Sequence, residues 1–326
     1  MLRSLSVTMH ETNNLSASLP ATVFAQLDSD SILEVNGTDA TRFLQGQLTC
    51  DLVALQPGNS TLGARCNPKG RMQSSFRLLK LGEEQYLLGI PSELLEAQQQ
   101  DLAKYAAFFK VQLDDVSDQW LRLGLWGDNL DAALAATGID QSAANLEKGL
   151  AVPVGEATFE IWLPREQGSA CMDALSPHAA AVPLNSWHLQ LIRLGIGQVQ
   201  EQTRESFIPQ MLNLQQLGGV SFQKGCYTGQ EIVARMEYLG KLKRRMYRLL
   251  WAGKELPAPG TSIQNSANGQ AVGEVVMAAQ SDEQIELLAV LQTETAELPT
   301  LIMHNINEPA LTLAPLPYEQ QMAAEK

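Results

Sequence analysis

The residues best suited to do chemistry surround Cys226. Thr228 and Glu231 have the spacing of a capping box, which predicts that a helix begins there. Cys226 then lies in the loop just before a helix N-terminus, two residues from Lys224. Backbone N–H groups and a nearby cation both favour a thiolate. The pattern therefore predicts an activated thiol at Cys226.

The alternative interpretation is that Cys226 is a small buried hydrophobic residue in a tight turn, as most free cysteines are. Gly225 and Gly229 flank it, and glycine lets a backbone approach a bound anion or cofactor closely. The other three cysteines, Cys50, Cys66 and Cys171, are predicted to be structural. Because no two cysteines have C-x2-C spacing, no metal site is expected.

The elements that must position this loop fall into two similar series followed by a β-rich segment. Residues 1–21 form a polar leader that is predicted to be loose. Residues 22–240 form an α+β unit with two halves, about 22–118 and 119–240, and residues 241–326 have the short strands of a small antiparallel barrel. Strands are expected at 31–35, 60–66, 71–79, 86–90, 110–113, 120–126, 151–154, 159–163, 244–250, 261–264, 271–278, 285–291, 300–304 and 311–314, and helices at 39–48, 92–108 and 129–136.

The charge of the chain is uneven. With 23 Lys+Arg against 36 Asp+Glu, the net charge of −13 opposes nonspecific binding of nucleic acid by the molecule as a whole. A basic stripe nevertheless precedes and enters the predicted barrel, at Lys241, Lys243, Arg244, Arg245 and Arg248. Such a stripe suits an anionic ligand or partner, and the alternative is a solvated strand edge protected by charge. Because no stretch has the length and hydropathy of a membrane span or a signal peptide, a cytoplasmic location is expected.

The signature of a known family stands at 224–231. Its residues are Lys224, Gly225, Cys226, Tyr227, Thr228, Gly229, Gln230 and Glu231. The stretch resembles the signature of the YgfZ family of bacterial folate-binding proteins, which is similar to the T-protein (aminomethyltransferase) of the glycine cleavage system. Further matches span nearly the whole chain, at 43–49, 66–72, 207–210, 213–214, 217–222 and 315–318.

The resemblance implies a fold and a function. The fold is a ring of two related α+β subdomains and a C-terminal antiparallel β-barrel, which enclose a central hole for tetrahydrofolate or another folate derivative. The function is that of an accessory protein, a monomer, which supports iron-sulfur enzymes, notably those that modify tRNA. In such a protein Cys226 is the functional residue of the signature.

The resemblance also implies which residues contact folate. Trp187 matches a tryptophan expected to touch the ligand, although Trp187, Leu191 and Leu194 share one helical face, which is typical of a core position. Asp30 stands where the family can carry another folate-contacting tryptophan, and is the second candidate contact. A carboxylate of the T-protein is replaced here by Arg193.

Three functions remain open at this point. The first is the folate-binding accessory protein just described. The second is an aminomethyltransferase-like enzyme of one-carbon transfer, which needs an acid or base that is missing between Lys69 and Glu83, where the T-protein-like hairpin would bring it. The third is a non-catalytic adapter for RNA or a modifying enzyme through the basic stripe.

Overall fold

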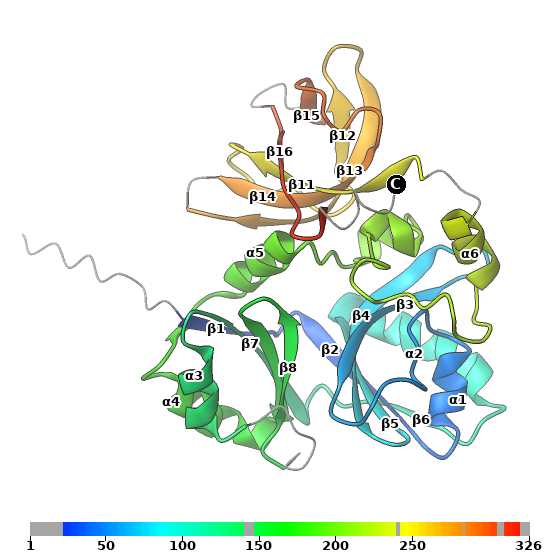
Figure 1. Ribbon diagram of the computed structural model, residues 1–326, viewed down its shortest axis with the longest axis vertical. Helices are drawn as coiled ribbons and strands as arrows, with labels where there is room; N and C mark the ends of the chain where they lie inside the picture. The colour runs from blue at the N-terminus through cyan, green and yellow to red at the C-terminus, as the bar shows by residue number, and fades with distance from the viewer. Residues whose placement is uncertain (1–21, 140–146, 239–241, 283, 305–309, 320–326) are drawn as a thin grey trace, which may run out of the picture.

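The computed structural model describes residues 22–139, 147–238, 242–282, 284–304 and 310–319. In this part the chain forms three β-sheets (Figure 1): two α/β halves lie side by side, and a third, curled sheet lies across them. The predicted α+β class is confirmed. No helix in the described part is long and apolar enough to cross a membrane.

The first sheet is antiparallel, with the strand order β3-β4-β5-β2-β6. The apolar residues of its outer face pack against helices α1 and α2, with Phe43, Phe76 and Leu102 in that core. In chain order this half consists of β2 (Asp30–Asn36), α1 (Ala40–Gln45), β3 (Ser60–Cys66), β4 (Met72–Gly82), β5 (Gln85–Pro91), α2 (Ser92–Ala106) and β6 (Gln112–Asp115).

The second sheet has the order β10-β1-β7-β9-β8, and helices α3 and α4 cover its outer face. It is formed by β1 (Thr22–Gln26), β7 (Trp120–Gly127), α3 (Leu130–Thr137), β8 (Leu150–Gly155), β9 (Thr158–Pro164), the 3-10 turn η2 (Arg165–Gln167), α4 (Gly168–Leu175) and β10 (Ala180–Ala181). In one respect this differs from the predicted division at residue 118. Strand β1 comes before the first half in sequence but pairs antiparallel with β7 of the second half.

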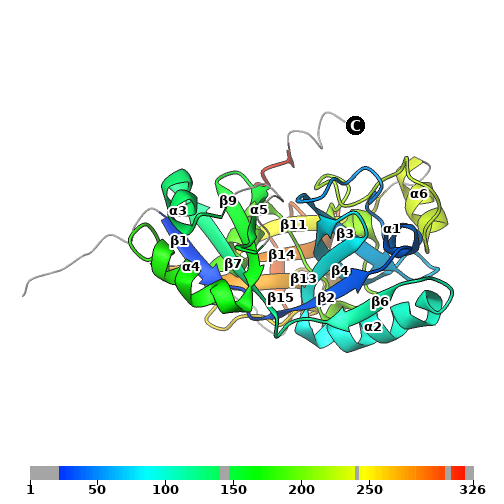
Figure 2. The ribbon, with the colours of Figure 1, turned by 90° about the horizontal axis from the view of Figure 1, so that it is seen from below.

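The inner faces of the two sheets meet each other. Seen from below, β2 continues from β1 and crosses from one sheet to the other (Figure 2). Apolar residues of both halves pack here, including Ile32, Leu79, Val152 and Trp162. This smaller core between the two sheets brings the middle of β4 next to β7 and β9.

The third sheet is antiparallel, with the order β15-β12-β13-β14-β11-β16. Its edges approach each other, since the backbone N–H of Leu311 donates to the carbonyl of Leu301 at an N···O distance of 2.8 Å. The sheet thus curls into a half-barrel, where the sequence predicts a small antiparallel barrel. Its strands are β11 (Arg244–Trp251), β12 (Ser262–Asn265), β13 (Gln270–Gln280), β14 (Ile285–Gln292), β15 (Leu301–Met303) and β16 (Thr312–Ala314).

The segment between the second half and the barrel joins all three parts. It contains α5 (Leu184–Leu194), the 3-10 turns η3 (Glu201–Thr203) and η4 (Pro209–Leu212), and α6 (Gln230–Tyr238). Helix α5 packs against β13 and β14 of the barrel (Figure 1). A central core includes Met72, Trp187, Val233 and Met246, which come from different parts of the fold.

Candidate functional site

The signature loop runs over the turn of the β3–β4 hairpin and enters α6. The helix begins at Gln230, close to the start that the capping box predicts. Gly229 precedes it with a φ of +85°, and a Cβ there would lie 2.5 Å from the carbonyl oxygen of Asn67. Gly70 has a φ of +70°, and a Cβ there would lie 2.9 Å from Cβ of Ile232. Two glycines therefore let the hairpin turn and the start of α6 touch.

Lys224 lies below this loop rather than on its surface. Its side chain is buried, and Nζ donates to the carbonyl oxygens of Leu48 and Cys50, each at 2.7 Å. Nζ also lies 5.2 Å from the ring centre of Tyr227. The ammonium group that was expected to act on the Cys226 thiol is thus bonded to carbonyl groups of a neighbouring loop.

Cys226 is the exposed member of the four cysteines, and all four are free thiols. The other three are buried, as predicted for structural cysteines. Burial raises the pKa of the Cys50 thiol to about 11, that of Cys66 to about 12 and that of Cys171 to about 11. These three stay protonated at neutral pH, so the accessible thiol chemistry belongs to Cys226.

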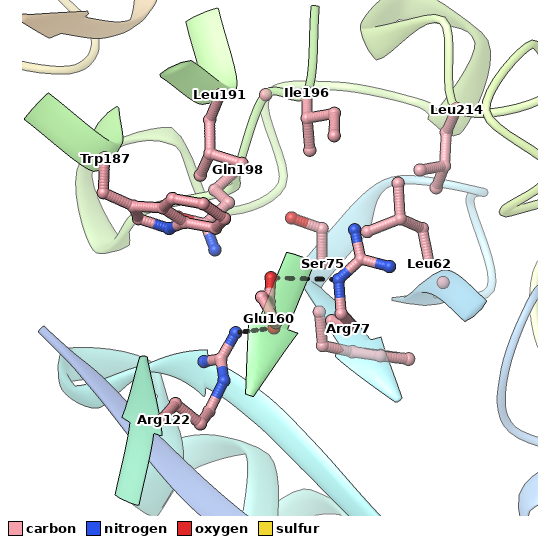
Figure 3. A pocket seen from close by; sticks show the side chains of 13 residues that line it. Leu62, Ser75, Arg77, Arg122, Glu160, Trp187, Leu191, Ile196, Gln198 and Leu214 are labelled. Atoms are coloured by element: carbon pink, nitrogen blue, oxygen red, sulfur yellow. Dashed lines mark hydrogen bonds and ion pairs between the residues drawn. The ribbon is translucent and has the colours of Figure 1, made fainter. Parts of the chain in front are cut away.

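A narrow cavity opens between the two halves and the segment after α5 (Figure 3). It encloses about 20 Å³, which is room for about one water molecule. Among the lining side chains of this cavity, Leu62 and Gln198 are half-buried and mark its opening. A ligand as large as a pterin therefore enters only if side chains of the wall move. The lining consists of Leu62, Gly63, Ser75, Phe76, Arg77, Arg122, Glu160, Trp187, Leu191, Ile196, Gly197, Gln198 and Leu214.

A chain of buried charges forms the floor of this cavity. Glu160 accepts from Nε of Arg77 at 3.0 Å and from Nη2 of Arg122 at 2.7 Å. Arg122 also donates to Asp30 at 2.7 Å and lies 4.4 Å from the ring centre of Trp162. Burial by itself raises the pKa of Glu160, but the two guanidinium groups outweigh it and lower that pKa. Glu160 is therefore a fixed anion rather than a proton carrier at neutral pH.

The terminal nitrogens of Arg77 point away from Glu160, into the space below Ile196 (Figure 3). Two N–H groups of a planar guanidinium suit a carbonyl or carboxylate oxygen of a ligand. The floor thus presents an anionic acceptor and a cationic donor side by side. A flat polar ring with both donors and acceptors fits this chemistry.

Trp187 lies on the opposite wall of the cavity and also belongs to the core, as its helical face predicts. The side chain is only 3 % exposed and belongs to the central core, where its ring lies 5.6 Å from that of Trp126. A Cβ at Gly124 would lie 2.3 Å from the Trp187 ring, so the indole rests directly on β7. The same indole lines the cavity opposite Glu160 (Figure 3).

Asp30 does not line this cavity, but it accepts a hydrogen bond from Arg122, which does line it. The sequence analysis missed Arg77, Arg122 and Glu160. Each of them is a charged residue with apolar neighbours on both sides in its strand, and this is the signal that could have found them.

The basic stripe does not form one continuous face. Lys241 lies outside the described residues. Along β11 side chains alternate, so Arg244 and Arg248 share one face, whereas Arg245 lies on the other, with Nε 2.9 Å from the Tyr247 hydroxyl. Arg248 donates to Glu286 at 2.6 Å, and the second oxygen of this carboxylate accepts from Arg193 at 2.7 Å. Lys243 is exposed.

The fold is that of the aminomethyltransferases. The glycine cleavage system aminomethyltransferase T from Bartonella henselae superposes with a TM-score of 0.71 over 92% of this chain and 87% of its own, at 17% identity. The GCVT N-terminal domain family matches residues 25–148. The class of protein is thereby defined as one that contains the GCVT N-terminal domain within an aminomethyltransferase fold.

Two relatives narrow the class to a family. The tRNA-modifying protein YgfZ of Yersinia enterocolitica is 34% identical over 313 residues, covering 93% of this chain and 94% of its own length. The protein of the same name from Photobacterium profundum is 33% identical over 298 residues, covering 85% and 89%. The chain belongs to the YgfZ family of tRNA-modifying proteins, and the resemblance read from residues 224–231 is confirmed.

Proposed function

We propose that this protein is a cytoplasmic, folate-binding accessory protein that supports iron-sulfur cluster assembly or repair in client enzymes that modify tRNA, and that Cys226 is its functional thiol. The observation that carries the folate part is the cavity between the two halves. It sets the Trp187 indole opposite the Arg77–Glu160 pair, in a fold that contains the GCVT domain.

The chemistry of the lining residues fits a tetrahydrofolate, and the ring enters once side chains of the wall move to widen the cavity. An indole offers an aromatic face to a pterin or aminobenzoyl ring. Glu160 can accept from ring N–H groups, and Arg77 can donate to a ring carbonyl. Both charged side chains are already held by ion pairs, so they are oriented before a ligand arrives.

The charged residues on the floor of the cavity argue against the second function, one-carbon transfer. Such a reaction needs a group that gives or takes a proton at a reacting nitrogen. Glu160 is the carboxylate of the cavity lining, and its pKa is lowered because two guanidinium groups hold it. A carboxylate in this state orients a ligand and does not exchange protons with it at neutral pH.

Cys226 supports the client-directed part of the proposal. Its thiol is exposed in the loop between η4 and α6, where another protein can reach it. Within the described residues no group of three or more His, Cys, Asp or Glu side chains could hold a metal ion. We infer that Cys226 acts as a single thiol, as a transient ligand or reactant, while the client supplies the remaining ligands.

The test is complementation by a Cys226→Ala variant in cells that lack the native protein. We expect folding to remain intact, because an exposed side chain is removed, with a stability loss of less than about 1 kcal/mol. Iron-sulfur-dependent tRNA modification, measured by mass spectrometry of tRNA nucleosides, should fall to the level of cells without the protein. A Cys171→Ala variant, which removes a buried thiol from another part of the fold, is the matched control. Full modification with Cys226→Ala would refute the role of the thiol.

A further inference from the structure

Two loops that are far apart in the sequence are bonded along their length. One is the segment 46–50 between α1 and β3, and the other is the segment 219–228 before α6. Thr49 connects them twice: its hydroxyl donates to the carbonyl of Gly219 at 2.6 Å, and its carbonyl accepts from the backbone N–H of Ser221 at 2.9 Å. The N–H of Thr228 donates to the carbonyl of Gly46 at 3.2 Å.

Lys224 is the one charged side chain in this described contact that reaches across it. Its ammonium group lies between the carbonyl oxygens of Leu48 and Cys50, both 2.7 Å away. The residue is 7 % exposed, so these two carbonyls replace water for the cation. The charge and hydrogen-bonding capacity of Lys224 are thus directed into the 46–50 segment.

The groups that face the ammonium come from both loops. Cys50 is a buried thiol whose pKa is raised to about 11, so it is neutral at neutral pH. Asp51 is the nearby anion, and Tyr227 presents its ring. Burial lowers the pKa of Lys224 to about 8, which leaves most of the ammonium charged at neutral pH. These surroundings hold a cation without needing a thiolate at Cys226.

We propose that Lys224 is a positioning residue, whose ammonium fastens the signature loop to the segment 46–50 and so fixes where the Cys226 thiol is presented. This inference rests on the proposed role of Cys226. It differs from the direct electrostatic role that the sequence predicts, in which Lys224 stabilises a thiolate. The two roles make different predictions, because fastening acts on the backbone of the loop, whereas a charge acts on the titration of the thiol.

The experiment compares Lys224→Met and Lys224→Gln with the wild-type protein by amide hydrogen exchange and by pH-dependent alkylation of Cys226. Methionine keeps the apolar stem and removes both hydrogen bonds. Glutamine has no charge but can still donate N–H groups to a carbonyl. Lys254→Met, a change at an exposed lysine of the barrel, is the matched control.

We expect the amides of Ser221 and Thr228 to exchange at least about tenfold faster in Lys224→Met, because the loop opens more often. The pH midpoint of Cys226 alkylation should stay unchanged. Lys224→Gln should keep part of the protection, and Lys254→Met all of it. The partial effect of glutamine keeps the test decisive if the methionine variant does not fold.

Unchanged exchange at Ser221 and Thr228 in both variants would overturn the proposal. So would a shifted alkylation midpoint with intact protection, which is the result expected for a purely electrostatic role. Neither result depends on complementation. A failure of the Cys226→Ala test would remove the biological purpose of the loop without changing whether Lys224 fastens it.

Discussion

At the scale of single residues, the structure separates one thiol from three. Cys50, Cys66 and Cys171 are buried and Cys226 is exposed, although all four are free. Burial disfavours the thiolate, because the charged form loses its hydration. The same chain therefore contains three inert cysteines and one that can meet a partner. Exposure and loop position are what distinguish Cys226.

This difference predicts selective labelling that depends on pH. At neutral pH iodoacetamide should modify Cys226 and leave the other three thiols intact, as peptide mass spectrometry can establish. The buried thiols have folded-state pKa values of about 11 to 12, above the ordinary value of 9.0. The unfolded chain releases these thiol protons at a lower pH than the folded chain does. The free energy of unfolding therefore falls as pH rises above about 9. Labelling of Cys50 or Cys66 at neutral pH at the rate of Cys226 would contradict this account.

At the scale of elements, the contact between the β3–β4 hairpin and α6 presents the signature loop. Gly229 is needed there for two reasons: a positive φ and a close approach to the carbonyl of Asn67. Gly218 has a similar φ of +72° but nothing within 4 Å of the place of a Cβ. A comparison of substitutions at Gly229 and Gly218 therefore separates the cost of a positive φ from the cost of a steric clash.

Gly229→Ala is predicted to destabilise the protein more than Gly218→Ala. Strain alone costs about 1–3 kcal/mol for a non-glycine residue at positive φ, and Gly229→Ala adds a collision with backbone atoms. Gly225→Ala, at a position with open space around it, should cost less than either. Urea denaturation of the three variants measures this order. Equal losses for Gly229→Ala and Gly218→Ala would mean that the hairpin and α6 are not in close contact.

Most elements could be predicted from the sequence, because apolar periodicity and turn residues are local signals. The strand at 120–126 and the hairpin around Asn67 are examples, and both are confirmed. The pairing of β1 with β7 could not be predicted, because sheet partners depend on contacts distant in sequence. The signature around Cys226 was readable as a motif. The Arg77–Glu160–Arg122 cluster could not be predicted as a motif, since its members come from separate strands.

At the scale of the whole molecule, the two α/β halves, helix α5 and the segment after it line the cavity between them. The barrel carries much of the negative charge, while the described part of the basic stripe is divided between two faces of β11. Arg248 shares Glu286 with Arg193 and contributes little free positive charge. The cavity, in contrast, combines charged, aromatic and apolar side chains from both halves. The whole-molecule arrangement thus favours a small ligand at the centre.

The most direct test of this account is the binding of tetrahydrofolate to the purified protein, measured by calorimetry and by quenching of tryptophan fluorescence. We predict binding of one molecule per chain. Arg77→Met should weaken it about tenfold or more through the loss of a charged hydrogen-bond donor, whereas Lys254→Met should bind as the wild type does. Urea denaturation checks that each variant is folded. No binding by the wild-type protein, or equal affinity of a folded Arg77→Met variant, would contradict the central claim.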